Sequence, residues 1–239
     1  MLEVRNLVAG YGDMAVIRDI SLNVQPGEIL LIGGENGAGK SMLLRSIAGF
    51  NKPSGGQVLL DGRPVTGMAP EKASQEGLRL VLDNHRVFPE LTVRDNLRLG
   101  MSALPKEKRG DYDSIEAEIF EVFPILREKY LARARDLSGG QQQILALGQA
   151  FVSRPKVLMC DEPSMGVAQA LLPPILGFLR KWAQSGAAII IVEQHLKVTQ
   201  PYCDRAMIIS RGAVAIDCPA SELDARLADM AAERHAARA

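Results

Sequence analysis

The stretch EILLIGGENGAGKSMLLRSIAG, residues 28–49, decides the fold of this chain. It begins with a short apolar run of the kind that forms a buried strand. GENGAGKS, residues 34–41, then fits the pattern G-x-x-x-x-G-K-[ST]. The residues after it have helical spacing that turns Leu44 and Ile47 inward, and Gly49 can end the helix. This order of strand, loop and helix predicts a phosphate-binding loop; the alternative is an ordinary glycine-rich turn.

The chemistry of this loop follows from its residue types. Glycines let backbone N–H groups approach phosphate oxygens, and the start of the following helix adds partial positive charge. We expect Lys40 to bridge the β- and γ-phosphates of a nucleotide and Ser41 to bind Mg²⁺. The residues expected to contact the nucleotide are Gly34, Glu35, Asn36, Gly37, Ala38, Gly39, Lys40, Ser41 and Met42.

A second segment supplies carboxylates for the same chemistry. In VLMCDE, residues 157–162, Asp161 ends an apolar strand, where its carboxylate can hold Mg²⁺. Glu162 follows directly and can polarise an attacking water. An isolated Asp-Glu pair after a strand is usually a surface turn. Together with a phosphate loop, the pair predicts a nucleotide-hydrolysing enzyme.

DLSGGQQQ, residues 136–143, also has the composition of an anion site at the start of a helix. The run that follows it places Ile144, Leu147 and Phe151 on one helical face. The alternative is a plain helix N-cap by Ser138. Two anion-binding loops so far apart in one chain make sense if they serve different molecules.

Short apolar runs that are followed directly by glycine-rich or polar functional segments indicate an α/β fold with a mainly parallel sheet. AAIIIV, residues 187–192, precedes EQH in the same way as the two runs above. Near the N-terminus, alternation and turn signals predict antiparallel strands beside this core. We expect one unit over residues 1–239, with its core at about 1–86 and 155–220, a helical subdomain at about 87–154 and a helical tail at 221–239.

The composition argues against several function classes. Lys plus Arg and Asp plus Glu number 28 each, so the formal net charge is zero and a general nucleic-acid or anionic-membrane binder is disfavoured. The N-terminus lacks a signal-peptide pattern, and the longest uncharged stretch, residues 163–179, is interrupted by prolines. We expect neither export nor a membrane span. If the protein works at a membrane, another chain must hold it there.

The cysteines, Cys160, Cys203 and Cys218, match no metal-binding spacing. Their odd number argues against a disulfide framework. We expect them to be inert packing residues in a reducing cytosol.

LSGGQ, residues 137–141, resembles the signature of the ATP-binding subunits of ABC transporters, and the resemblance covers nearly the whole chain. GYG, residues 10–12, resembles the family loop whose aromatic residue stacks on adenine, which implies this role for Tyr11. The alternative is a structural tyrosine in a turn. VEQH resembles the segment that carries the family's switch histidine, which implies that His195 touches the γ-phosphate; a structural histidine is the alternative.

More narrowly, VFPELTVRDNLRLG (87–100), DEPSMGVAQ (161–169) and VEQH (192–195) resemble the short ATPase of branched-chain amino acid type importers. This implies ATP hydrolysis that powers uptake of branched-chain or related amino acids or small organic acids, with ATP and Mg²⁺ as cofactors. The implied partners are membrane permease subunits that grip a groove near residues 83–100, and a separate substrate-binding protein, with no nucleic acid. The protein would then be cytoplasmic and peripheral on the inner face of the membrane.

The resemblance also implies a P-loop NTPase core and a head-to-tail dimer with itself or a related ATPase subunit. Each ATP would lie between GENGAGKS of one subunit and LSGGQ of the other. The residues acting in trans would be Ser138, Gly139, Gly140 and Gln141. ATP would hold the subunits together, and its hydrolysis would release them.

Three positions depart from the family pattern. Asp83 stands where the family has glutamine and this subfamily often glutamate; its shorter carboxylate can favour Mg²⁺. Met42 stands where a second hydroxyl is usual, so we expect one phosphate hydrogen bond to be missing. Ala168 stands where an aspartate is common in the family, although the subfamily is similar here.

Two other classes remain open. A soluble ABC-type ATPase of DNA repair would carry a long heptad insertion, and one of translation would carry two cassettes; neither is visible. A small-molecule kinase with a phosphate loop would leave LSGGQ and VEQH unexplained.

Overall fold

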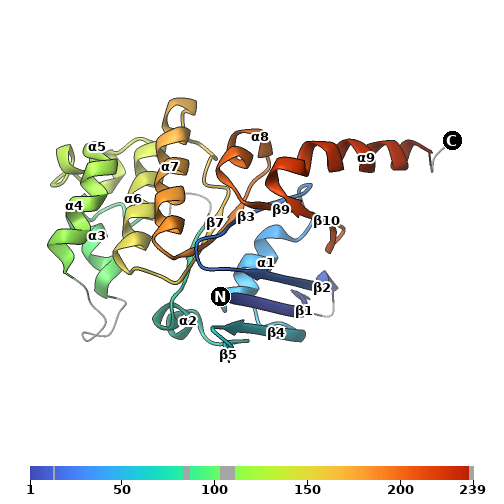
Figure 1. The fold of residues 1–239 in the computed structure, drawn as a ribbon. Helices are drawn as coiled ribbons and strands as arrows, with labels where there is room; N and C mark the ends of the chain where they lie inside the picture. The colour runs from blue at the N-terminus through green and yellow to red at the C-terminus, as the bar shows by residue number, and fades with distance from the viewer. Residues whose placement is uncertain (13, 83–86, 103–110, 237–239) are drawn as a thin grey trace.

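A computed structural model of the chain describes residues 1–12, 14–82, 87–102 and 111–236 (Figure 1). Its centre is a six-stranded sheet in the order β10-β9-β3-β8-β7-β6. The strands are β3 (Ile29–Gly33), β6 (Leu78–Val81), β7 (Val157–Asp161), β8 (Ala188–Val192), β9 (Arg205–Ser210) and β10 (Ala213–Pro219). All neighbours pair in parallel except β9 with β10, so the expected mainly parallel sheet is confirmed.

Three central strands, β3, β7 and β8, are buried at every position, as their continuous apolar runs predicted. Their carboxyl ends reach the same edge of the sheet, because Ile32 and Asp161 both lie opposite Val192. Ligands of parallel sheets bind beyond this edge. The sheet therefore brings the segments after all three strands together.

A second sheet has the order β2-β1-β4-β5 and is antiparallel throughout, as expected near the N-terminus. Its strands are β1 (Leu2–Tyr11), β2 (Met14–Val24), β4 (Gly55–Leu60) and β5 (Arg63–Pro64). Helix α1 (Lys40–Ile47) packs in a core shared with both sheets. Leu44 and Ile47 are fully buried in that core, as the helical spacing predicted.

A group of helices lies to the left of the sheets in Figure 1. It contains α3 (Val93–Ser102), α4 (Tyr112–Val122), α5 (Pro124–Glu128), η2 (Ala134–Asp136) and α6 (Gly139–Val152). Ile144, Leu147 and Phe151 of α6 are buried, as expected. Phe151 packs edge-on against Trp182 of α7 (Leu172–Gln184), with ring centroids 4.8 Å apart. This contact packs α6 against α7. The division of the chain into core, helical subdomain and tail stays a prediction.

The remaining elements close the fold around the two sheets. They are α2 (Pro70–Glu76), η3 (Gln169–Leu171), α8 (Leu196–Thr199), η4 (Gln200–Tyr202), η5 (Ala220–Glu222) and α9 (Leu223–Ala236). Helix α9 extends away from the sheets towards the C-terminus (Figure 1). Among the described residues, no helix has both the length and the apolar character needed to cross a membrane.

The cysteines are free thiols, and Cys160 and Cys218 are buried whereas Cys203 is half-buried. Burial raises the pKa of each thiol, that of Cys203 to about 12. Thiols with raised pKa values form little thiolate, which agrees with a packing role.

Candidate active site

The phosphate loop follows β3 at the carboxyl edge of the sheet. Gly34, Gly37 and Gly39 have φ values of +147°, +78° and +107°, a region that disfavours side chains. A Cβ on Gly34 would lie 2.2 Å from the carbonyl oxygen of Ile209, and one on Gly39 would lie 2.6 Å from Cγ2 of Ile17. Glycine is therefore required at Gly34 and Gly39, and the middle of the loop, residues 35–37, is exposed.

Lys40 lies directly after this loop as the first residue of α1, and it is buried. Its Nζ donates to the carbonyl oxygens of Gly34 at 2.8 Å and Glu35 at 3.1 Å, so the ammonium group lies across the start of the loop. The helix has no side-chain N-cap. Its first N–H groups and the buried ammonium together suit a phosphate group.

Ser41 and Asp161 meet across the sheet edge, although they are far apart in the chain. The Ser41 Oγ donates to Oδ1 of Asp161 at 3.1 Å. A hydroxyl and a carboxylate are hard oxygen ligands of the kind that Mg²⁺ takes beside nucleotide phosphates. The pair expected from sequence to share a metal is therefore in contact and fits that ion.

Glu162 follows Asp161 in an unusual backbone conformation, with φ at +50°. Its N–H donates to the carbonyl oxygen of Val192 at 2.9 Å, and its Oε1 accepts from Nε2 of Gln194 at 2.7 Å. The half-buried carboxylate thus lies at the carboxyl edge of the sheet, one residue after Asp161, which contacts the phosphate loop. This position suits a group that polarises a water at a nucleotide.

Two residues at this edge were missed by the sequence reasoning. Gln194 contacts Glu162 directly. Glu193 is buried, and its carboxylate accepts from the N–H of Ser164 at 2.9 Å and from the Ser164 Oγ at 2.8 Å. Burial raises the pKa of Glu193. The sequence signal for both residues is a polar pair directly after an apolar strand.

His195 is exposed and immediately precedes α8. It lines a surface depression of 470 Å³ together with Gln194 and the loop residues Gly34, Glu35 and Asn36. The structure therefore brings His195 near the phosphate loop. Within the described part of the chain, however, the side chain hydrogen-bonded to Glu162 is that of Gln194.

The signature segment begins α6 in a capping box. The Ser138 Oγ accepts from the N–H of Gln141 at 3.4 Å, and Gln141 Oε1 accepts from the N–H of Ser138 at 2.9 Å. The N-cap expected as the alternative is thus present, while Ser138 stays exposed. Gly140 is buried, and a Cβ there would lie 2.9 Å from Cδ1 of Leu171, so this glycine has a packing reason of its own.

The other expected site residues lie as follows. Tyr11 ends β1 and is 65% exposed, so its ring is accessible for stacking. Met42 is buried in the core around α1, and any contact it makes with a nucleotide must come from its backbone. Asp83 lies outside the described residues.

Comparison of the sequence and the structure with known proteins shows the family of this chain. The family model described as ABC transporter matches residues 17–165. The chain belongs to the ABC transporter family. It is an ATP-binding subunit that hydrolyses ATP.

Two relatives match this ABC transporter subunit over nearly their whole length. The chain is 33% identical to the high-affinity branched-chain amino acid transport ATP-binding protein BraG of Pseudomonas aeruginosa, over 90% of this chain and 91% of that protein. It is also 33% identical to the probable branched-chain amino acid transport ATP-binding protein LivF of Archaeoglobus fulgidus, over 93% and 94% of the two chains. The ribose import protein RbsA 2 of Streptomyces avermitilis is 30% identical, but only 43% of its length is covered.

Solved structures agree with this family. A nucleotide-free ATP-binding cassette from an ABC transporter has a TM-score of 0.83 and 26% identity, over 95% of each chain. The α/β fold of a P-loop NTPase is thereby confirmed.

Proposed function

We propose that this ABC ATPase powers the uptake of branched-chain amino acids, or of related amino acids or small organic acids. The support is the match to BraG and LivF over at least 90% of all chains compared. Every relative named above is a transport subunit, which favours this function over a soluble ATPase of DNA repair or translation.

Within this function, Lys40 contacts the β- and γ-phosphates of ATP, Ser41 and Asp161 hold Mg²⁺, and Glu162 polarises the water. The observation that carries the assignment is the 3.1 Å contact between Ser41 and Asp161, which joins the loop to the carboxylates. Bound Mg²⁺ would neutralise phosphate charge. The exposed ring of Tyr11 stacks on adenine.

In a head-to-tail dimer, Ser138, Gly139, Gly140 and Gln141 complete the site of the partner subunit. The exposure of Ser138 in the single chain supports this proposal. The capping box does not exclude it, because a hydroxyl oxygen that accepts one weak hydrogen bond still has its own proton to donate to a phosphate. Asp83 stays a proposed Mg²⁺ ligand on the basis of the sequence alone.

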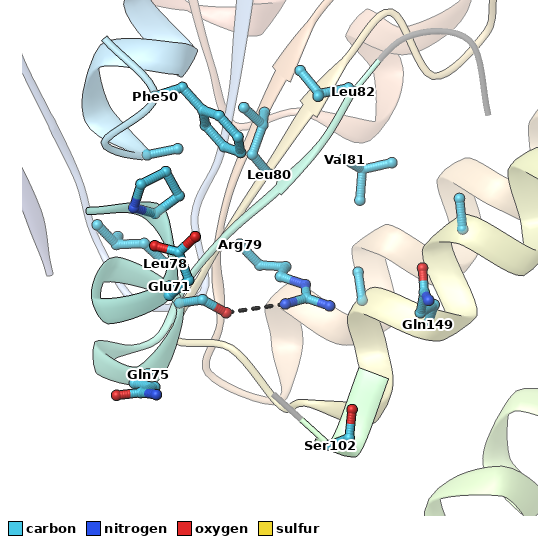
Figure 2. A pocket seen from close by; sticks show the side chains of 15 residues that line it. Phe50, Glu71, Gln75, Leu78, Arg79, Leu80, Val81, Leu82, Ser102 and Gln149 are labelled. Carbon is cyan, nitrogen blue, oxygen red and sulfur yellow. Dashed lines mark hydrogen bonds between the residues drawn. The ribbon is translucent and has the colours of Figure 1, made fainter. Parts of the chain in front are cut away.

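The permease subunits bind a cleft of 560 Å³ between the sheet edge and the helices (Figure 2), whose described lining residues lie outside the segment 83–100 expected from the sequence. β6 forms its floor, α2 and Phe50 line one side, and α3 and α6 line the other through Ser102 and Gln149. Leu82, the residue directly before Asp83 in the sequence, is one of its lining residues. A partner in this cleft therefore touches the strand that leads to the Mg²⁺ side of the nucleotide site.

Arg79 gives this cleft its polarity. Its Nη1 donates to the Ser74 Oγ at 3.0 Å, and within the described residues it makes no ion pair (Figure 2). Its side chain is half-buried, and burial lowers the pKa of its guanidinium. The described residues that line the cleft are mostly apolar, and among them Glu71 is the one other charged residue. We therefore expect the permease segment to bring apolar side chains and a carboxylate for Arg79.

Held in this way, the subunit lies on the cytoplasmic face of the membrane, and a separate binding protein delivers the substrate. The test is transport into proteoliposomes that contain the permease pair and the binding protein. We expect ATP-dependent uptake of leucine that falls about a hundredfold or more with Glu162→Gln. Uptake of ribose or spermidine in place of leucine would contradict the substrate class, and uptake unaffected by Glu162→Gln would contradict the role of Glu162.

A further inference from the structure

The segments after β7 and β8 are joined by several hydrogen bonds at the carboxyl edge of the sheet. The N–H of Glu162 donates to Val192 at 2.9 Å. The N–H and hydroxyl of Ser164 both donate to the Glu193 carboxylate, at 2.9 and 2.8 Å. Gln194 then donates to Glu162 at 2.7 Å. The two segments therefore form one bonded unit around the Glu162 carboxylate.

Glu193 anchors this unit to the sheet. It is 2% exposed, and its N–H donates to the carbonyl oxygen of Ile32 on β3 at 3.1 Å. Its carboxylate is held by both donors of Ser164, so neither its backbone nor its side chain can turn freely. A fixed Glu193 also fixes the direction in which the next residue, Gln194, leaves the strand end.

Glu162 needs such support because its backbone is strained. A φ of +50° is unfavourable for a residue with a side chain and is retained only where the surroundings hold it. Its Oε1 is held by Gln194, whereas no hydrogen bond to its Oε2 is found within the described residues. One oxygen is thus fixed and the other is available to a water.

We infer that Gln194, rather than His195, is the positioning residue that orients the Glu162 carboxylate for catalysis. The inference rests on the role proposed for Glu162. Both side chains are exposed, but within the described residues Gln194 reaches Glu162 whereas His195 makes no hydrogen bond. Consecutive side chains at a strand end diverge, so both cannot face Glu162 in the same way.

The chemistry of an amide suits this task. The Gln194 Nε2 is a permanent donor at any pH near neutrality, while an imidazole changes its charge in that range. The orientation of Glu162 in this protein is therefore independent of a histidine's protonation state. An amide donor therefore holds one carboxylate oxygen without exchanging a proton with it.

The test compares steady-state ATP hydrolysis by single variants with Mg²⁺-ATP as substrate. Gln194→Ala should lower kcat about tenfold or more with little change in KM, because the loss of a hydrogen bond to a charged group affects turnover and not the phosphate loop. Gln194→Glu keeps the shape but replaces the donor by a like charge, so its kcat should be lower still. Gln184→Ala, an exposed glutamine on α7, is the matched control and should behave as the wild type.

The comparison with His195 decides between the two residues. His195→Ala should lower kcat less than Gln194→Ala does. An equal or larger loss with His195→Ala would overturn the inference. Fluorescent-ATP titration should give a similar dissociation constant for all these variants, and its loss in Gln194→Ala would assign Gln194 to binding and also overturn the inference.

A double variant shows whether Gln194 acts through Glu162. If it does, Glu162→Gln with Gln194→Ala should be no slower than Glu162→Gln alone. A further loss in the double variant would overturn the inference while leaving the role of Glu162 intact. If Glu162→Gln alone retained wild-type turnover, the proposed role of Glu162 would fail, and the inference with it.

Discussion

Met42 shows at the scale of a single residue how the structure changes an interpretation drawn from sequence. The sequence marked it as a missing hydroxyl beside Ser41. In the structure its side chain is buried in the core around α1, and its Sδ accepts from Nδ2 of Asn51 at 2.9 Å. A methionine here fills space under the phosphate loop, so its main contribution is to packing.

Met42→Ala should therefore lower the free energy of unfolding by about 2–5 kcal/mol, because a buried side chain is replaced by a cavity. Met14, at the start of β2, is 71% exposed and supplies the control. Met14→Ala should change the free energy of unfolding by at most about 0.5 kcal/mol. Urea unfolding measures both, and equal midpoints for the two variants would show that Met42 is not a packing residue.

At the scale of elements, much was predictable because the signals are local. The runs that became β3, β7 and β8 are continuous and apolar, and the spacing in α6 marked its buried face. The contact between Gln194 and Glu162 was not predictable, because it depends on the register that sets Asp161 opposite Val192. The position of Arg79 in a cleft could not be predicted from the sequence either, since the cleft forms only where β6, α2 and α6 meet.

Arg79→Leu should weaken binding to the permease pair at least about tenfold, because a desolvated charge pair across the interface is lost. Arg63→Leu, on the exposed edge strand β5, is the matched control and should bind as the wild type does. Surface plasmon resonance with the permease pair in nanodiscs gives both dissociation constants. Equal weakening by the two variants would mean that general charge, and not the cleft, attracts the permease.

At the scale of the whole molecule, two anion-binding loops begin two different helices. α1 starts between the sheets, whereas α6 starts in the group of helices beside them (Figure 1). The first loop already contacts Asp161, a proposed Mg²⁺ ligand, in the same chain, and Glu162 follows directly. We therefore propose that the second loop acts on ATP held by another subunit.

Light scattering of Glu162→Gln with ATP and Mg²⁺ tests whether the second loop binds ATP in trans. The protein should be mainly monomeric alone and dimeric with ATP, because ATP that is not hydrolysed continues to hold the subunits together. Adding Gly139→Asp should abolish the dimer, since its carboxylate would face the γ-phosphate in a poorly screened site. An acidic residue in the first turn of α6 suits the helix dipole, so the fold and the ATP affinity of the single subunit should be retained. A double variant that dimerises as well as Glu162→Gln would contradict the claim and leave LSGGQ as a helix cap.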